Sequence, residues 1–400
     1  MLKHVWLPIV AVITVAGAVA LGPRGTMSSL MPDDPIEARI LSEVRFPRVT
    51  LGFLAGAALA TAGMAFQALF RNPLATPYTL GVSAGASLGA AIYVHLGMTA
   101  SLAGIPGYSF AALGGAFLAI ALVYAVARAT YGFSSSTLLL AGVAISFLFT
   151  SVILAIQYIG DVTTSFRIGR WLLGGLEVVG FLPVIHVLPF AVIGIAILLA
   201  ISRDLDLLVV GEESAASRGV SVTTVKKLIF AAASLMVGGV VATCGPIGFV
   251  GLVVPHIGRL VLGPKHRTLA PFSVLGGGTF LVACDAVGRT VVAPIEIPVG
   301  IITALIGGPF FLAMLIQGHT RQRLGGQHEY RDTDRRHRTH KSRRRQADLE
   351  GRGACRRLRH HRRADCADRA GTRSLSPRRG GVDRKRASAG SLRRGRSACH

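Results

Sequence analysis

The sequence has little charge for its length, and the shortage is confined to its first four-fifths. Only 16% of the 400 residues are charged, whereas soluble globular domains carry about 25%. Residues 1–318 hold 17 Lys and Arg and 12 Asp and Glu, and residues 319–400 hold 26 and 8. The low charge of residues 1–318 therefore excludes an ordinary soluble enzyme for this part of the chain. The net charge of +23 is no evidence for a nucleic-acid partner, because the excess of basic residues lies in the tail and is not spread over a folded domain. We therefore expect no nucleic-acid partner.

Sequence patterns of catalysis and metal binding are also missing. There is no H-E-x-x-H and no Walker A sequence (G-x-x-x-x-G-K-[ST]), so any ATP chemistry belongs to another chain. The five cysteines form no C-x-x-C pair, which indicates neither a zinc site nor a disulfide framework. The apolar segments carry little ionisable character beyond Asp285 and Arg289, whose i,i+4 spacing favours mutual neutralisation. We therefore expect no catalytic residue, no cofactor and no metal site.

In place of charge, the chain has hydrophobic segments of about 20 residues, the length of a helix that spans a bilayer. They are apolar on all sides, unlike the striped helices of soluble proteins, and too long for barrel strands. Nine of them lie near residues 5–22, 49–70, 78–97, 108–128, 137–160, 182–202, 226–244, 271–292 and 299–317. A shorter segment at 246–262 is interrupted by prolines. The fold class predicted is all-α, a polytopic transmembrane bundle of about ten helices in residues 1–318.

The distribution of Lys and Arg in the loops predicts the orientation. With ten spans and the N-terminus inside, nine such residues fall in inside loops and seven in outside loops. This favours a multi-pass protein of the cytoplasmic (inner) membrane with both termini cytoplasmic. The alternative for the first segment, after Lys3 and His4, is a cleaved signal peptide, although the segment is longer than a usual signal core.

Glycines spaced four residues apart indicate close helix packing. Gly52 and Gly56 share one helix face, as do Gly81, Gly85 and Gly89, and small residues at this spacing let two helix backbones approach. We expect these glycines to contact neighbouring helices rather than a ligand.

The polar segments between the hydrophobic ones carry the most specific motifs. In chain order they are Arg45-Phe46-Pro47-Arg48, Gln67 with the segment 71–77, the segments 81–86 and 245–259, Asp285 with Arg289, the segment 296–300, and Gly307-Gly308-Pro309-Phe310. Together, over roughly residues 40–317, they resemble the membrane-permease family of bacterial ABC importers for iron–siderophores, haem and vitamin B12. One such motif would be weak, but five in the family's order and spacing are specific.

The resemblance implies a type II ABC importer permease with ten transmembrane helices. Such permeases work as pairs, with two cytoplasmic ABC ATPase subunits on one side and an extracytoplasmic substrate-binding protein on the other. The permease then has no enzymatic activity of its own, and a separate subunit hydrolyses ATP. Whether the second permease subunit is identical or a relative is left open.

The resemblance also assigns roles to particular residues. Arg45, Arg48 and Arg289 match the arginines that meet carboxylates of the binding protein, a task that suits a permanently charged, bidentate group. The alternative for the first two is simple flanking of a helix end. The cytoplasmic gate matches the turn before residue 138, at Ser135 and Ser136, where serine is also a common helix N-cap.

The predicted ATPase-coupling segment is the polar loop at about 204–227. We expect it to form a short amphiphilic helix pair, against the alternative of a plain solvated loop. Five residues match the family's G-x-x-x-A-x-x-x-G core, namely Gly211, Glu212, Glu213, Ala215 and Gly219. Arg218 departs from the apolar residue usual before the second glycine.

Residues 319–400 differ from everything before them. Arginine is frequent, Ile and Phe are absent, and such a composition cannot form a packed core. One interpretation is a disordered cytoplasmic arm that binds anionic lipid or nucleic acid. We favour the other, a reading frame that slipped near the end of a permease gene.

The predicted function is transport of a ferric siderophore through an ATP-driven ABC importer. The same importer type carrying haem or vitamin B12 is the first alternative, because nothing in the sequence names the ligand. An ion-coupled secondary transporter and a membrane enzyme are the rivals from other classes, and the missing carboxylates and catalytic motifs disfavour both.

Overall fold

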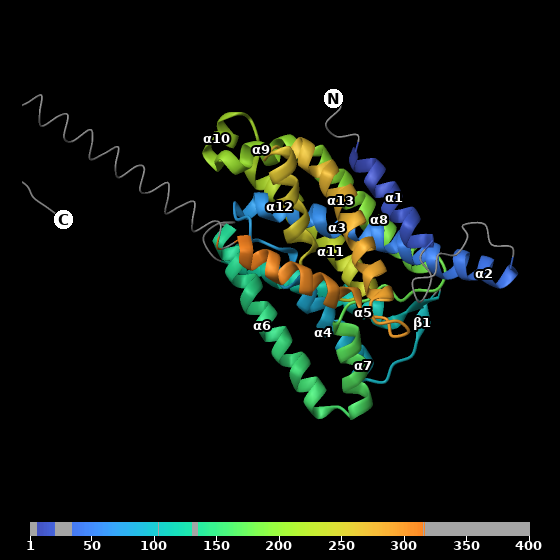
Figure 1. Cartoon of the computed structure of the whole chain (residues 1–400). Coiled ribbons are helices and arrows are strands. Elements are labelled where there is room, and N and C mark those ends of the chain that lie inside the picture. The colour runs from blue at the N-terminus through green and yellow to red at the C-terminus, as the bar shows by residue number, and fades with distance from the viewer. Residues whose placement is uncertain (1–5, 21–33, 103, 130–134, 315, 317–400) are drawn as a thin grey trace, which may run out of the picture. The chain divides into compact units, whose positions relative to one another are not determined.

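The computed structural model describes residues 6–20, 34–102, 104–129, 135–314 and 316 (Figure 1). The chain divides into two units, Met1–Gln317 and Gly318–His400. The basic tail, and with it the frame-slip interpretation, lies outside the described residues.

The hydrophobic segments fold as helices, and the prediction of an all-α transmembrane bundle is confirmed. Within the described residues, six helices are long and apolar enough to cross a membrane. They are Pro35–Phe70, which contains α3 (Phe46–Phe70), and α5 (Gly107–Ala129), α6 (Ser135–Ile159), α8 (Leu182–Ala200), α11 (Val222–Cys244) and α13 (His266–Thr290). Four shorter apolar helices are α1 (Trp6–Ala20), α4 (Val82–His95), α12 (Val250–Leu262) and Val299–Met314.

Helix α3 is the centre of the bundle. It packs against α13, α11, α8 and α12, and nearly all of its side chains from Leu51 onward are buried. Figure 1 shows α3 in the middle of these helices and α6 at the rim. One face of α6 remains exposed with large apolar side chains, among them Leu140, Phe147 and Leu154, whereas Phe149 is buried. Helix α6 is the more hydrophobic of the two, so the central position of α3 does not follow from hydrophobicity.

The helix that contains α3 begins earlier than the sequence predicts. Asp34 accepts a hydrogen bond from the backbone N–H of Ile36 at 3.0 Å and starts α2 (Pro35–Ile40). A π-helical turn, η3 (Leu41–Arg45), then leads into α3. Pro47 has no N–H to donate to the carbonyl of Glu43, four residues earlier. That carbonyl instead accepts from the backbone N–H of Gly180 at 2.7 Å, and the helix continues through the proline.

Glycine contacts bring α3 against α13 and α12, as the four-residue spacing predicts. A Cβ on Gly56 would overlap the backbone carbonyl of Gly277, and one on Gly63 would overlap Gly251. The same holds for Gly85 of α4 against Gly115 of α5. These backbones pass so closely that only glycine fits at the crossing points.

We expect Gly56→Ala to lower the free energy of unfolding by about 1–3 kcal/mol, because α3 and α13 must separate to admit the methyl group. Thermal unfolding of the purified protein in detergent measures the effect. Gly114→Ala on α5 is the control, since a Cβ there meets open space, and alanine is the better helix former by about 1 kcal/mol. Equal melting temperatures for both variants and the parent would contradict the packing argument.

Two of the four shorter helices, α4 and α12, start late because a tight turn precedes each of them. Residues Pro77–Leu80 form a 3₁₀ turn, η4, and Gly81 has φ +75°, so α4 starts at Val82 rather than near 78. Phe249 adopts φ +66° and delays the start of α12 to Val250. Gly307 leaves the space in which the Phe249 ring packs, which brings the 245–259 and 307–310 motifs together.

The pattern of hydrophobic segments does not by itself predict three short helices and one hairpin. Helix α7 (Val162–Leu172) follows α6, and Asp161 caps it by accepting from the N–H of Thr164 at 3.3 Å. Hydrogen bonds from Thr164 lower the pKa of the Asp161 carboxyl. Helices α9 (Ser202–Val210) and α10 (Glu212–Ser217) form the expected short helix pair. Strands β1 (Ser101–Leu102) and β2 (Ile105–Pro106) pair antiparallel between α4 and α5.

Candidate functional site

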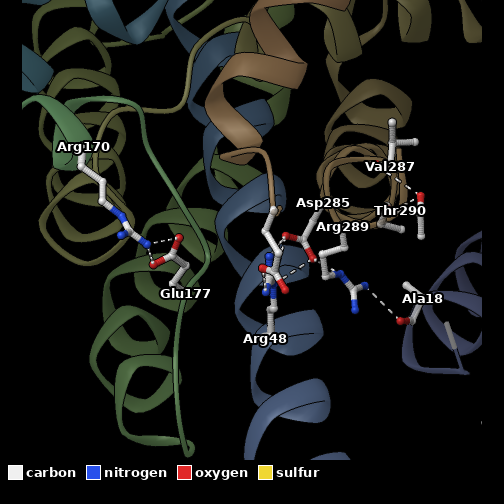
Figure 2. A network of polar contacts seen from close by, with 10 residues as sticks. Ala18, Arg48, Arg170, Glu177, Asp285, Val287, Arg289 and Thr290 are labelled. Atoms are coloured by element: carbon white, nitrogen blue, oxygen red, sulfur yellow. Dashed lines mark hydrogen bonds and ion pairs between the residues drawn. The ribbon is translucent and has the colours of Figure 1, made fainter. Parts of the chain in front are cut away.

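A buried ion-pair network joins α3 to α13 at one end of the bundle, called here the Arg48 end. The Arg48 guanidinium of α3 donates to Asp285 of α13, with Nη2 at 2.9 Å and Nε at 3.1 Å from Oδ1. Its Nη1 lies 2.6 Å from Oε2 of Glu296. Arg289, one turn after Asp285, places Nε 3.1 Å from Oδ2. Figure 2 shows Arg48 directed at Asp285 and the side chain of Arg289 beside Asp285, extending toward Ala18.

Because the network is buried, removing one of its partners costs a large free energy of folding. Asp285 is 4% exposed and Arg48 and Arg289 are 8% exposed, so each charge depends on its partners for solvation. Arg289 also donates through Nη2 to the carbonyl of Ala18 at 3.1 Å, near the C-terminus of α1, where a cation is favoured. Two arginines and two carboxylates, counting Glu296, leave the network without net charge.

The structure brings the three predicted docking arginines to the same end of the bundle, in different surroundings. The neutralisation expected between Asp285 and Arg289 is present. Arg48 is the additional partner that the sequence analysis missed, since 237 residues separate it from Asp285. Arg45 is only half-buried, and its Nη1 lies 3.5 Å from the carbonyl of Val19.

At the opposite end, called here the Arg71 end, the first residue of α10, Glu212, forms ion pairs that attach the helix to the bundle. Glu212 Oε2 accepts from Lys226 Nζ of α11 at 2.7 Å, and Glu212 Oε1 lies 3.6 Å from Nη2 of Arg71, the residue that ends α3. The Lys226 side chain is 6% exposed, whereas Glu212 is 45% exposed. Glu212 thus stabilises a buried ammonium from the surface. The neighbouring Glu213 is exposed.

The other predicted coupling residues shape α10. Ala215 is fully buried, which fixes the face that α10 turns inward. Gly219 has φ +84° and ends the helix in a Schellman turn, with Val220 N–H donating to the Ala215 carbonyl and Gly219 N–H to the Ala216 carbonyl. Gly211 precedes Glu212 and separates α9 from α10.

Helix α9 is fastened to two membrane helices as well. Asp206 Oδ1 accepts from the backbone N–H of His266 at 2.7 Å, and His266 Nδ1 lies 2.8 Å from the same oxygen. Arg71 Nε donates to the carbonyl of Leu208 at 3.2 Å. The α9–α10 pair is therefore tied to α3, α11 and α13 by polar contacts. Acidic and basic residues in the polar segments between the hydrophobic ones were the available sequence evidence for these contacts.

The predicted gate residues begin α6. Ser135 is the first residue of that helix, and only its backbone is described. Ser136 follows on an exposed position. The helix that they open has an exposed apolar face, so Ser135 and Ser136 lie at the end of a surface that the described part of the chain leaves uncovered.

The sequence analysis missed one catalytic pattern, a hydrolase motif that is present in the sequence but lacks its structural context. Gly81–Gly85 reads G-x-S-x-G, a pattern that positions a nucleophile between a strand and a helix. Here Ser83 is buried in α4 and follows a 3₁₀ turn rather than a strand. The glycines serve helix packing instead.

Comparison with known proteins gives consistent results. The chain is 45% identical over 301 residues to the uncharacterized ABC transporter permease protein YvrB of Bacillus subtilis (strain 168), covering 74% of this chain and 84% of the relative. It is 43% identical over 286 residues to the cobalamin import system permease protein BtuC of Halobacterium salinarum, covering 69% and 73%. It is 36% identical over 280 residues to the hemin transport system permease protein HmuU of Yersinia pestis, covering 68% and 82%.

A solved structure has the same fold. It is described as an inward-facing conformation of a metal-chelate type ABC transporter, and it matches with a TM-score of 0.71 at 30% identity, covering 78% of this chain and 98% of the other. The FecCD transport family matches residues 6–317. The chain therefore belongs to the FecCD transport family, as a membrane permease subunit of an ABC importer of the iron-chelate, haem or vitamin B12 type whose ATP is hydrolysed by a separate subunit.

Proposed function

We propose that this permease moves a ferric siderophore inward across the cytoplasmic membrane, through a path that it forms with a second permease subunit. The observation that carries the mechanism is the fastening of the α9–α10 pair to α3, α11 and α13. A soluble ATPase that pushes on this pair would move three membrane helices together. The Arg71 end is then cytoplasmic and the Arg48 end extracytoplasmic, with both termini of the chain in the cytoplasm.

The second subunit is proposed to cover the exposed face of α6. Leu140, Phe147 and Leu154 are large apolar side chains more than half exposed on one transmembrane helix. The proposed gate at Ser135 and Ser136 lies at the cytoplasmic end of this face, where small hydroxyl residues of two subunits can pack closely and still separate to pass a bulky ligand.

A ferric chelate is the proposed cargo because several relatives carry iron compounds by name. They include the Fe(3+)-citrate import system permease protein YfmD of Bacillus subtilis, 37% identical over 290 residues. Cobalamin is the second candidate, favoured by the 43% identity to the Halobacterium protein. Uptake of labelled ferric siderophore, haem and cobalamin into proteoliposomes that also contain the ATPase and the binding protein tests the cargo. Uptake of cobalamin alone would overturn the iron assignment and leave the importer unchanged.

The binding protein is proposed to dock at the Arg48 end through Arg45, Arg48 and Arg289. Glu296 is 42% exposed and holds Nη1 of Arg48, so an incoming carboxylate has to compete with Glu296 for this arginine. Arg45 is half-buried, whereas Arg48 and Arg289 are buried, which makes Arg45 the docking residue that can be changed with the least effect on folding.

We expect Arg45→Glu to lower uptake about fivefold at limiting binding protein, because a repulsive carboxylate replaces an attractive cation. The measurement is initial uptake against binding-protein concentration, with ATPase activity of the assembled transporter as a check on integrity. Arg39→Glu is the matched control, since Arg39 lies on α2 at the same end and is highly exposed. Equal loss in both variants would contradict a specific role for Arg45.

A further inference from the structure

A long apolar groove opens on the side of the bundle between α1, α3 and α8. Its volume is about 610 Å³. The walls include Val12 and Val19 of α1, Phe46 and Phe53 of α3, Val184 of α8 and Leu275 of α13. The one hydroxyl in the lining belongs to Thr50, which already donates to the carbonyl of Phe46 at 2.7 Å. The groove therefore offers hydrocarbon surface and no polar group in need of a partner.

The groove has the length of one bilayer leaflet. Along α1 it extends from Pro8 to Val19, which is about 16 Å at 1.5 Å per residue. Half of a hydrocarbon core about 30 Å thick is about 15 Å. On α3 the lining stops at Leu54, the ninth of 25 residues from the Arg48 end. The groove thus covers the half of the bundle that faces the leaflet at the Arg48 end.

The lining and the length of the groove together indicate its occupant. Thirteen of its fourteen lining residues are apolar, and the groove is about as long as the hydrocarbon half of one leaflet. A single extended hydrocarbon chain is the occupant that this lining and length fit.

A cation lies at the mouth of the groove. Arg45 directly precedes Phe46, and its Nη1 approaches the carbonyl of Val19; Phe46 and Val19 both line the groove. Its guanidinium is therefore at the depth where a lipid of this leaflet has its phosphate. Arginine donates to phosphate through a planar fork of N–H groups.

We propose that this groove binds one acyl chain of a phospholipid whose phosphodiester is held by Arg45. The site depends on the chain being a membrane protein and not on the cargo or on the docking role of Arg45. A bound lipid phosphate and a partner carboxylate would compete for Arg45, so lipid binding is measured without the binding protein.

Native mass spectrometry of the purified permease in detergent with added phosphatidylglycerol tests the proposal. We expect one retained lipid per chain, and at least fivefold lower retention in Val12→Trp, which fills the groove. Ile13→Trp is the matched control, because Val12 and Ile13 are 67% and 66% exposed on the same helix but only Val12 lines the groove. Ala16→Trp is a second filling variant, and melting temperatures verify that each variant is folded.

The phosphate is tested separately from the chain. Arg45→Gln is expected to lower retention at least fivefold, whereas Arg39→Gln on the exposed α2 helix is expected to leave it unchanged. Diacylglycerol with the same acyl chains but no phosphate should be retained at less than a fifth of the level measured for phosphatidylglycerol. Equal retention in Val12→Trp and Ile13→Trp overturns the proposal. Loss of the dimer mass in Val12→Trp also overturns it, since the groove would then be a contact between two copies.

Discussion

Replacing Asp285 with Asn is expected to lower the free energy of unfolding by about 3–5 kcal/mol, the usual cost of removing one partner from a buried ion pair. Arg48 and Arg289 would remain inside the bundle without the carboxylate that both of them contact. Asparagine has nearly the same size, so the loss reports charge rather than packing. Because the network links α3 to α13, the damage should include separation of these helices at the Arg48 end.

Thermal and denaturant unfolding in detergent measure the effect of Asp285→Asn. Glu177→Gln is the matched control: Glu177 also pairs with an arginine, Arg170 at 2.8 Å, but both side chains are more than half exposed (Figure 2). Exposed pairs of this kind contribute about 0–1 kcal/mol. If Asp285→Asn destabilises the protein no more than Glu177→Gln does, the Asp285 network is not a structural tie.

Replacing Glu212 with Gln is expected to lower ATP-driven uptake at least tenfold while the protein stays folded. The substitution removes the charge that Lys226 and Arg71 share, and the nearly buried Lys226 loses its ion pair with Glu212. Glu212 is itself half exposed, which limits the loss of stability. The α10 helix would then be free to move without α3 and α11, and a tenfold loss corresponds to about 1.4 kcal/mol of coupling.

The measurement compares uptake and ATP hydrolysis in the same proteoliposomes. We expect Glu212→Gln to keep ATP hydrolysis and lose transport, because the ATPase still turns over while its motion no longer reaches the membrane helices. Glu213→Gln is the matched control, with the same change of charge one residue away on an exposed position. Equal uptake by the two variants would exclude Glu212 as the residue that ties α10 to the bundle.

Both predictions depend on residue pairs that are far apart in the chain. The i,i+4 pair of Asp285 and Arg289 could be predicted from spacing. The pairs Arg48–Asp285 and Arg71–Glu212 could not, since helical periodicity constrains neighbours within a few turns and these partners lie on different helices far apart in the chain. Residue types suggested which charges needed partners, and only packing could choose the partners.

By itself the sequence determined that this protein is an all-α membrane bundle, because the free energy of burying uncharged segments of bilayer length dominates every other local preference. It also determined the close helix crossings, since glycine every fourth residue leaves room for a second backbone. The tertiary structure decided where helices begin, as α12 does after Phe249. It also decided which hydrophobic helix is central, α3, and which is peripheral, α6. It also decided which charges meet, because an isolated helix lacks the neighbours that bury Arg48 and Lys226 and supply their carboxylates.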